Sequence, residues 1–215
     1  NYAEGKNVII EYRWAAGQID QLPTLASDLV RLNCSVIVAT GGDPPVLAAK
    51  AATETIPIVF VSGSGPIEAG FVRSMNHPGG NITGITMLAA EVAQKRLEIL
   101  HELVPKEADI ALLNNPTSPA SKREQQDLLE AARILGRHLT IVYAANADEI
   151  SAAFLKLVEH RVAGLIIGAD NLFSNQSGYI AALALRHALP ALGPFREYAV
   201  AGNLMSYGAS IDDAY

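Results

Sequence analysis

The alternation of short β-rich runs with helical patterns is the feature of this sequence that most constrains its fold. Each run rich in Val, Ile and Leu is followed by a stretch with helical periodicity, and such runs lie at 35–40, 56–61, 109–114, 139–144 and 164–167. This alternation is typical of βαβ units around parallel sheets. The sequence therefore predicts an α/β chain with two doubly wound, Rossmann-like lobes.

Weaker patterns complete the expected order of elements. Further strands are expected at 8–14, 81–87, 189–192 and 204–207, and a short helix is expected from the turn at 62–66 to about Met75. We place the first lobe at 1–84 and the second at 85–204, and we expect 205–215 to return to the first lobe. A short strand-like connection near 80–87 is what a hinge between two lobes would look like.

Composition and charge exclude several classes of partner. The 215 residues carry a formal charge of −6, and the 16 Lys and Arg residues are scattered, so nucleic acid is not expected as a partner. No run approaches the roughly 18 apolar residues of a membrane span, so direct membrane insertion of this segment is not expected either. Cys34 is the single cysteine, and we interpret it as a structural thiol.

Motifs of enzymes and cofactor sites are missing from the sequence. Neither Thr40-Gly41-Gly42 nor Gly63-Ser64-Gly65 fits a phosphate-binding loop or a dinucleotide fingerprint. There is no Gly-x-Ser-x-Gly nucleophile elbow, and the five histidines show no spacing typical of metal ligands. We therefore predict no catalytic residues, no cofactor and no metal.

Polar, Gly- and Pro-rich stretches follow four of the expected strands, at 40–44, 62–66, 114–119 and 169–171. In open parallel sheets, ligands bind beyond the carboxyl ends of the strands, where helix N-termini present free N–H groups. Helix capping explains any one stretch taken alone, but all four lying at strand ends favours a ligand site. Asp170, directly after a buried run, fits both a helix cap and a partner for a ligand ammonium group.

Several strings identify a family that the chain resembles. They are Glu-Gly-Lys-Asn-Val at 4–8, Glu-Tyr-Arg-Trp-Ala at 11–15, Ile-Pro-Ile-Val-Phe at 56–60, Pro-Gly-Gly-Asn-Ile-Thr-Gly at 78–84 and Met-Ser-Tyr-Gly at 205–208. They resemble the ABC-transporter substrate-binding family that includes tryptophan- and tyrosine-uptake binding proteins. The resemblance implies a type I periplasmic-binding fold whose two lobes close on a small molecule by a hinge. It also implies a membrane permease as partner, and a protein that is periplasmic or lipid-anchored at the cell surface.

The same resemblance implies which parts of the fold this chain holds. Family members begin with a signal or lipoprotein peptide, followed by a first strand and helix, and they continue past Tyr215. We therefore expect the first strand and the C-terminal part of the family fold to be absent from this chain, together with the signal segment.

The resemblance also implies a set of ligand-binding residues. In the first lobe these are Thr40, Gly41, Asp43, Ser62 and Gly63, and in the second lobe Asn115, Thr117, Ser118, Ser121, Asp170 and Phe195. For an amino-acid ligand, Ser62, Ser118 and Ser121 would hold the carboxylate, and Asp170 would hold the ammonium. The carboxylate of Asp43 would disfavour a ligand carboxylate beside it.

Two alternatives to a transport receptor stay open at this point. The effector-binding domain of a transcription regulator shares the type I fold but requires a helix-turn-helix upstream. A small-molecule hydrolase using Asp170 or Glu68 would require a nucleophile and a base that the sequence lacks. For a receptor, the expected solute is an amino acid or related small carboxylate, aromatic ones included, while a nucleobase, a sugar or an aromatic acid stays open.

Overall fold

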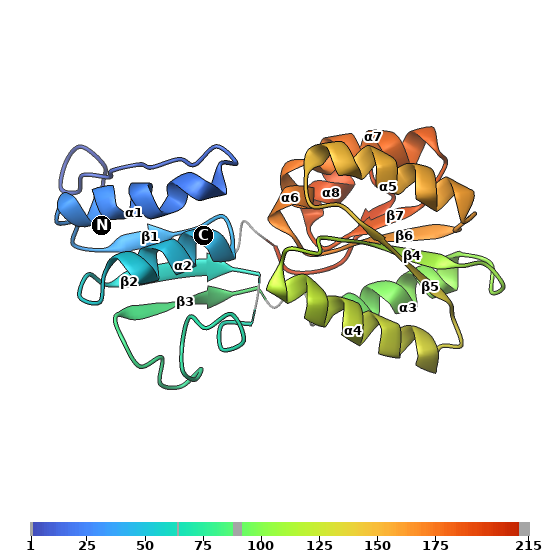
Figure 1. Cartoon of the computed structure of the whole chain (residues 1–215), viewed down its shortest axis with the longest axis horizontal. Helices are drawn as coiled ribbons and strands as arrows, with labels where there is room; N and C mark the ends of the chain where they lie inside the picture. The colour runs from blue at the N-terminus through green and yellow to red at the C-terminus, as the bar shows by residue number, and fades with distance from the viewer. Residues whose placement is uncertain (1, 64, 88–91, 211–215) are drawn as a thin grey trace. The chain divides into compact units, whose positions relative to one another are not determined.

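The computed structural model describes residues 2–63, 65–87 and 92–210. The chain divides into two compact units, one of Asn1–Ser62 with Pro66–Ile85 and one of Gly63–Gly65 with Thr86–Tyr215. Each unit is built around its own sheet, and we describe each by itself (Figure 1). Within the described residues, no helix is both long and apolar enough to cross a bilayer.

The first unit holds a three-stranded sheet in the order β1-β2-β3. Its strands are β1 (Ile37–Ala39), β2 (Ile58–Ser62) and β3 (Ile82–Thr86), and its helices are η1 (Ile19–Gln21), α1 (Leu22–Arg31) and α2 (Asp43–Ala52). The strands β1 and β2 run parallel. The core lies between the sheet and the helices, where fully buried Val46 of α2 packs with Ile58 and Phe60 of β2.

The expected strand at 8–14 is not formed. Apart from an isolated bridge between Glu4 and Val8, this segment has no regular structure, and Ile9 and Trp14 are 84% and 76% exposed. A strand requires a neighbour that pairs with its backbone N–H and C=O groups, and no described strand pairs with this segment. The β-rich pattern of 8–14 was therefore insufficient to predict a strand.

The expected helix ending near Met75 is replaced by turns. Gly70 has a φ of 74°, in the left-handed region that interrupts a helix. The amides of Phe71 and Val72 both hydrogen-bond to the carbonyl of Pro66, so the chain curls back on itself. This geometry places the side chains of Phe71 and Val72 in the core of the first unit.

The second unit holds a five-stranded sheet in the order β5-β4-β6-β7-β8, with every neighbouring pair parallel. Its strands are β4 (Ile110–Asn114), β5 (Leu139–Tyr143), β6 (Gly164–Ile167), β7 (Ala191–Gly193) and β8 (Met205–Ser206). Its helices are α3 (Ala93–Leu103), α4 (Pro119–Ile134), α5 (Ala147–Glu159), α6 (Asn171–Asn175), α7 (Ser177–Arg186) and α8 (Arg196–Val200). Parallel strands joined by helices confirm the predicted α/β class.

Helices cover both faces of this sheet (Figure 1). The helices α5 and α7 pack on one face, in a core that includes Leu113, Phe154 and Ile180. The helices α3 and α4 pack on the other face, in a core that includes Leu97 and Leu128. Alternate residues of β4 enter opposite cores, which explains why the strand reads as a continuous apolar run.

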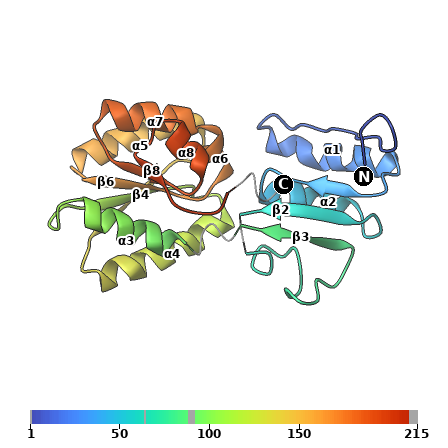
Figure 2. The ribbon, with the colours of Figure 1, turned by 180° about the vertical axis from the view of Figure 1, so that it is seen from behind.

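The end of the described chain differs from the expectation that 205–215 return to the first lobe. Met205 and Ser206 pair with Leu192 and Gly193 of β7, so β8 belongs to the second sheet. The physical reason is the turn after α8, where the backbone and side-chain amides of Asn203 both hydrogen-bond to the carbonyl of Tyr198. This turn brings the chain directly back beside β7, with α8 next to β8 (Figure 2). Residues 211–215 lie outside the described residues.

Candidate ligand-binding site

The strand order of the second unit places a topological switch point between β4 and β6. From β4 the chain moves outward to β5, then crosses to β6 and continues outward through β7 and β8. Loops that follow the two strands on either side of such a point leave in opposite directions and open a crevice at the carboxyl edge of the sheet. The loops at this position begin at Asn115 and at Gly168, which are two of the four polar stretches predicted from the sequence.

A direct hydrogen bond joins the two loops across the switch point. The Nδ2 of Asn115 donates to Oδ1 of Asp170 at 3.1 Å. The Oδ1 of Asn115 accepts the backbone N–H and the hydroxyl of Thr117, at 3.0 and 2.8 Å. The structure therefore brings together three of the predicted site residues in one cluster.

The structure shows the helix-cap role of Asp170 and leaves its role as a partner for a ligand ammonium group as a prediction. It is the N-cap of α6, where Oδ1 accepts the backbone N–H of Leu172 at 2.9 Å. Among the described residues, no donor bonds Oδ2 and no Lys or Arg pairs with the carboxylate, which is partly exposed. Oδ1 therefore caps the helix, while Oδ2 has no hydrogen-bond donor within the described ranges.

The N-terminus of α4 lies beside this cluster in sequence and follows β4. Ser118 is its N-cap residue, but its side chain makes no capping hydrogen bond. Ser121, on the first turn, is fully buried, and its Oγ has no hydrogen-bond partner among the described residues. The first turn of α4 therefore has no side-chain cap and contains an unsatisfied hydroxyl.

Charged side chains that the sequence analysis missed lie beneath the two loops. Glu124 of α4 and Arg96 of α3 form an ion pair at 2.6 Å, and both are buried. The signal was present in the helical pattern, because Arg96 lies on the same face of α3 as the buried residues Ala93 and Leu100. A charged residue at a core-facing helix position could therefore have indicated a buried ion pair at Arg96.

Tyr198 of α8 completes this buried polar layer. Its ring is fully buried, and its hydroxyl lies 3.3 Å from Oγ of Ser174. Burial raises the pKa of the Tyr198 phenol well above its ordinary value, while the hydrogen bond to Ser174 opposes the shift and the charges of Asp170 and Glu124 add to it. Tyr198 is therefore protonated throughout the physiological range.

The end of β6 requires glycine for close approach. A Cβ at Gly168 would lie 2.9 Å from the carbonyl oxygen of Leu113 and 3.3 Å from Oε2 of Glu124. Both distances are shorter than ordinary van der Waals contact, so a larger residue would push the loop away from the sheet.

In the first unit, the structure joins two of the predicted residues. The hydroxyl of Ser62, at the end of β2, donates to Oδ1 of Asp43 at 2.7 Å. Asp43 is the first residue of α2, where its negative charge is favourable at the helix N-terminus. Thr40 and Gly41 lie in the loop between β1 and α2. This carboxylate occupies the kind of position in which a ligand anion would otherwise bind.

Gly63 and Phe195 are two predicted site residues that do not join the clusters described above. Gly63 groups with the second unit, although Ser62 before it belongs to the first. Phe195 is the N-cap residue of α8 and is only 7% exposed, because its ring is part of the core that packs against α5 and α7. Phe195 therefore has a packing role in the structure.

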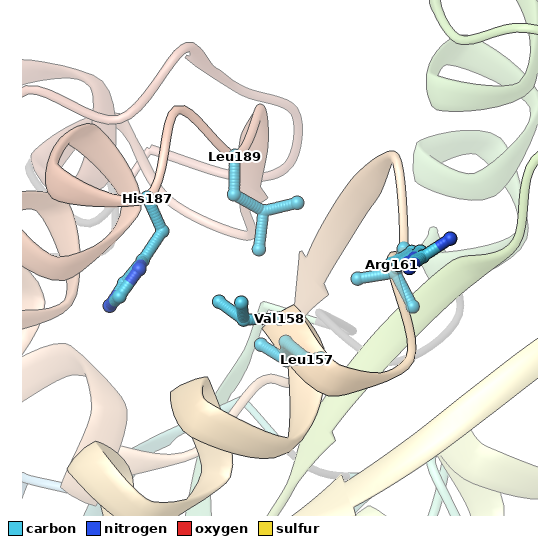
Figure 3. A pocket seen from close by; sticks show the side chains of 6 residues that line it. Leu157, Val158, Arg161, His187 and Leu189 are labelled. Carbon is cyan, nitrogen blue, oxygen red and sulfur yellow. The ribbon is translucent and has the colours of Figure 1, made fainter.

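A pocket of about 190 Å³ lies elsewhere on the second unit, lined by Leu157, Val158, Arg161, Val162, His187 and Leu189. Figure 3 shows the side chains of Leu157, Val158 and Leu189 between those of His187 and Arg161. Val162 and Leu189 precede β6 and β7, so this pocket opens at the amino edge of the sheet. Ligand pockets usually have volumes of about 300–1,000 Å³, and the polar loops lie at the opposite edge, so we assign no ligand here.

In the part of the chain that the structure describes, no cluster of three or more His, Cys, Asp or Glu side chains has the arrangement of a metal site.

The fold and the polar loops at the carboxyl edge of its sheets define a class, the type I periplasmic-binding fold, which solved structures share. A conserved domain protein from Vibrio cholerae O1 biovar El Tor is similar at a TM-score of 0.87 and 26% identity, over 95% of this chain and 68% of that one. A Streptococcus ABC domain solved in complex with L-Trp is similar at a TM-score of 0.84 and 20% identity, over 98% of this chain and 70% of that one.

A family model described as ABC transporter substrate binding protein matches residues 1–214, and this chain belongs to that family. Its members are substrate-binding proteins and not enzymes. The tyrosine-binding protein of Clostridioides difficile strain R20291 is 27% identical over 191 residues, which are 89% of this chain. This chain spans about half (54%) of the length of that curated relative.

Proposed function

We propose that this chain is the ligand-binding part of a receptor for an ABC uptake transporter, and that its solute is an aromatic amino acid. The observation that supports the ligand class is Oδ2 of Asp170, which lies at the switch point and has no donor in the part of the chain that the structure describes. Oδ1 is held by Leu172 and Asn115, so the carboxylate is fixed in orientation before any ligand arrives. A rigid carboxylate with one open oxygen suits an ammonium group.

The carboxylate of the amino acid is assigned to the first turn of α4. Ser118 leaves the turn without a side-chain cap, and Ser121 brings a buried hydroxyl without a partner among the described residues. Free amides and a hydroxyl at a helix N-terminus bind carboxylates well. Ammonium and carboxylate partners thus lie on the two loops that Asn115 joins, as the backbone of an amino acid requires.

The first unit contributes neutral groups to the same solute. Asp43 already places a negative charge at the start of α2 and accepts the hydroxyl of Ser62, which disfavours a second carboxylate there. Thr40 and Gly41 are assigned to the non-ionic part of the ligand, and Gly63, which groups with the second unit, is assigned to the same part. Binding by both units favours a closed state through a hinge, and the closed receptor delivers its solute to a membrane permease at the outer surface of the membrane.

Two similar proteins, at 27% and 20% sequence identity, support an aromatic amino acid as the solute. The curated relative is named a tyrosine-binding protein, and the Streptococcus structure contains L-Trp. Family membership supports a receptor over the two alternatives, because a regulator or a hydrolase would belong to other families.

Titration calorimetry of the full-length protein with L-tyrosine and L-tryptophan tests this proposal. At least one of them should bind with one-to-one stoichiometry, and mass spectrometry should recover it unchanged after prolonged incubation. A solute at about a hundredfold its dissociation constant should stabilise the protein by about 2.7 kcal/mol. Absence of binding to both amino acids, or steady conversion of either into a product, would contradict the proposal.

A further inference from the structure

Among the charged residues of the second unit that the structure describes, Arg96 and Glu124 are the most deeply buried, and they form an ion pair. The exposed fractions of the two side chains are 0% and 1%, and Nη2 of Arg96 lies 2.6 Å from Oε1 of Glu124. A buried ion pair is a weak source of stability, because desolvation of both charges offsets their attraction. A chain that needed only a packed core between α3 and α4 would use apolar residues at these positions.

The second oxygen of Glu124 explains why a carboxylate is present. Oε2 accepts the backbone N–H of Ala169 at 2.9 Å, and Ala169 immediately precedes Asp170. The space around Oε2 is matched to glycine at position 168, where a Cβ would approach this oxygen to 3.3 Å. Glu124 therefore holds the loop after β6 through the backbone of Ala169, and Asn115 holds it through the side chain of Asp170.

Arg96 links this loop to two other parts of the unit. Its Nη1 donates to the carbonyl of Tyr207 at 3.4 Å, directly after β8. Arg96 itself lies in the first turn of α3, the first helix after the chain leaves the first unit at Ile85. One guanidinium thus joins the start of α3, the end of β8 and, through Glu124, the loop that carries Asp170.

The pKa shifts of Glu124 and Arg96 are consistent with a link between this ion pair and the loop of Asp170. Burial raises the pKa of Glu124, the charge of Arg96 and the hydrogen bond from Ala169 oppose the shift, and the charge of Asp170 adds to it. Burial lowers the pKa of Arg96, and the charge of Glu124 opposes that shift. The charge of Asp170 therefore acts on Glu124, and Arg96 supplies the opposing positive charge.

We propose that Arg96 and Glu124 are positioning residues of the ligand site, which hold Ala169 so that the open oxygen of Asp170 faces the ligand ammonium. This inference rests on the proposed function, because it assigns its role through Asp170. The pair acts on the geometry of the loop and contacts no ligand itself.

The double variant Arg96→Met with Glu124→Leu tests the inference. Removing both charges together avoids an unpaired buried charge, so cooperative folding should persist. The readout is the preference for L-tyrosine over desaminotyrosine, which lacks the ammonium, measured by calorimetry. We expect the double variant to lose at least tenfold of this preference, because the Ala169 amide has lost its acceptor. A purely structural pair would weaken both ligands equally.

The matched control is an exposed ion pair on the same helix. Lys95 and Glu98 are about half exposed and bond at 2.8 Å on α3. The variant Lys95→Met with Glu98→Leu should retain the wild-type preference. If the buried-pair variant folds and also keeps the wild-type preference, the inference is wrong.

Hydrogen exchange on the wild-type protein decides the question if the double variant does not fold. The Ala169 amide should be protected in the ligand-free protein and change little when L-tyrosine is added, because Glu124 already holds it. An amide that exchanges freely until ligand is added would overturn the inference. The same measurement, made without ligand, separates this inference from the proposed function if the wild type binds neither amino acid.

Discussion

The buried hydroxyl of Ser121 has opposite consequences for the free and the liganded protein. In the described structure its Oγ has no partner, and an unsatisfied buried hydroxyl costs about 1–3 kcal/mol. We expect Ser121→Ala to raise the free energy of unfolding of the ligand-free protein by about 1 kcal/mol. The same variant should weaken amino-acid binding several-fold, because the ligand carboxylate loses a donor.

Chemical denaturation and calorimetry on the same samples measure both effects. Ser27→Ala is a suitable control, because that hydroxyl lies exposed on α1 and bonds the carbonyl of Pro23. If Ser121→Ala leaves affinity unchanged, Ser121 has no contact with the ligand.

Tyr198 gives the molecule a predictable response to alkaline pH. Its pKa is raised in the folded state above the ordinary value of about 10, so above pH 10 the unfolded chain binds fewer protons than the folded one. The contribution is therefore fully present below pH 10 and is lost as pH rises, at up to about 1.4 kcal/mol per pH unit. Tyr198→Phe should flatten this decline.

Denaturation midpoints between pH 8 and 11 test this prediction. Tyr143→Phe is the control, because it removes the same phenol hydroxyl from a side chain that is 46% exposed. At neutral pH, Tyr198→Phe should cost about 0.5–1.5 kcal/mol through its lost contact with Ser174. Equal alkaline slopes in the wild type and Tyr198→Phe would disprove the buried-phenol explanation.

At the scale of elements, the junction of β6 with its loop depends on glycine. Gly168→Ala would place a methyl group 2.9 Å from the Leu113 carbonyl oxygen, so we expect a loss of about 1–3 kcal/mol in stability. Gly178→Ala on α7 is the matched control, because nothing lies within 4 Å of the added Cβ. That control should stabilise by up to about 1 kcal/mol. Urea denaturation of both variants distinguishes them, and an unchanged Gly168→Ala would contradict the close approach.

Elements with strong local signals were predicted well from the sequence. The strand expected at 109–114 is observed at Ile110–Asn114, and the helical stretch expected after the run at 139–144 is observed as α5, Ala147–Glu159. Asn146 and Glu149 form a reciprocal cap at the start of that helix, which is a local signal. The strand prediction for 8–14 was wrong because a strand needs a pairing neighbour, and the residues of the segment itself do not show whether one is present.

The candidate site was predictable in part for the same reason. Strand ends and polar loops are local features, and they indicated Asn115, Thr117 and Asp170, which the structure brings together. The contact of Glu124 with Ala169 joins positions 45 residues apart. Such a contact follows from the packing of α4 against the sheet and has no signal in local sequence.

At the scale of the whole molecule, two units with separate cores each bring polar loops to the carboxyl edge of a sheet. Similar solved structures share this fold. In the proposed function, the charged ends of the solute bind the second unit, and Thr40 and Gly41 of the first unit contact its neutral part. This assignment depends above all on recognition of the ligand ammonium group by the carboxylate of Asp170.

A cycle of two proteins and two ligands tests that claim most directly. Calorimetry compares the wild type and Asp170→Asn, each with L-tyrosine and desaminotyrosine, with Asp109→Asn as a control that lies before β4. Asn caps helices as well as Asp does, so folding should be preserved. Losing a charge-assisted hydrogen bond of about 1.5–3 kcal/mol should cost the variant tenfold or more in affinity for L-tyrosine, with little change for desaminotyrosine. Equal affinities of the wild type and Asp170→Asn for L-tyrosine would contradict the account.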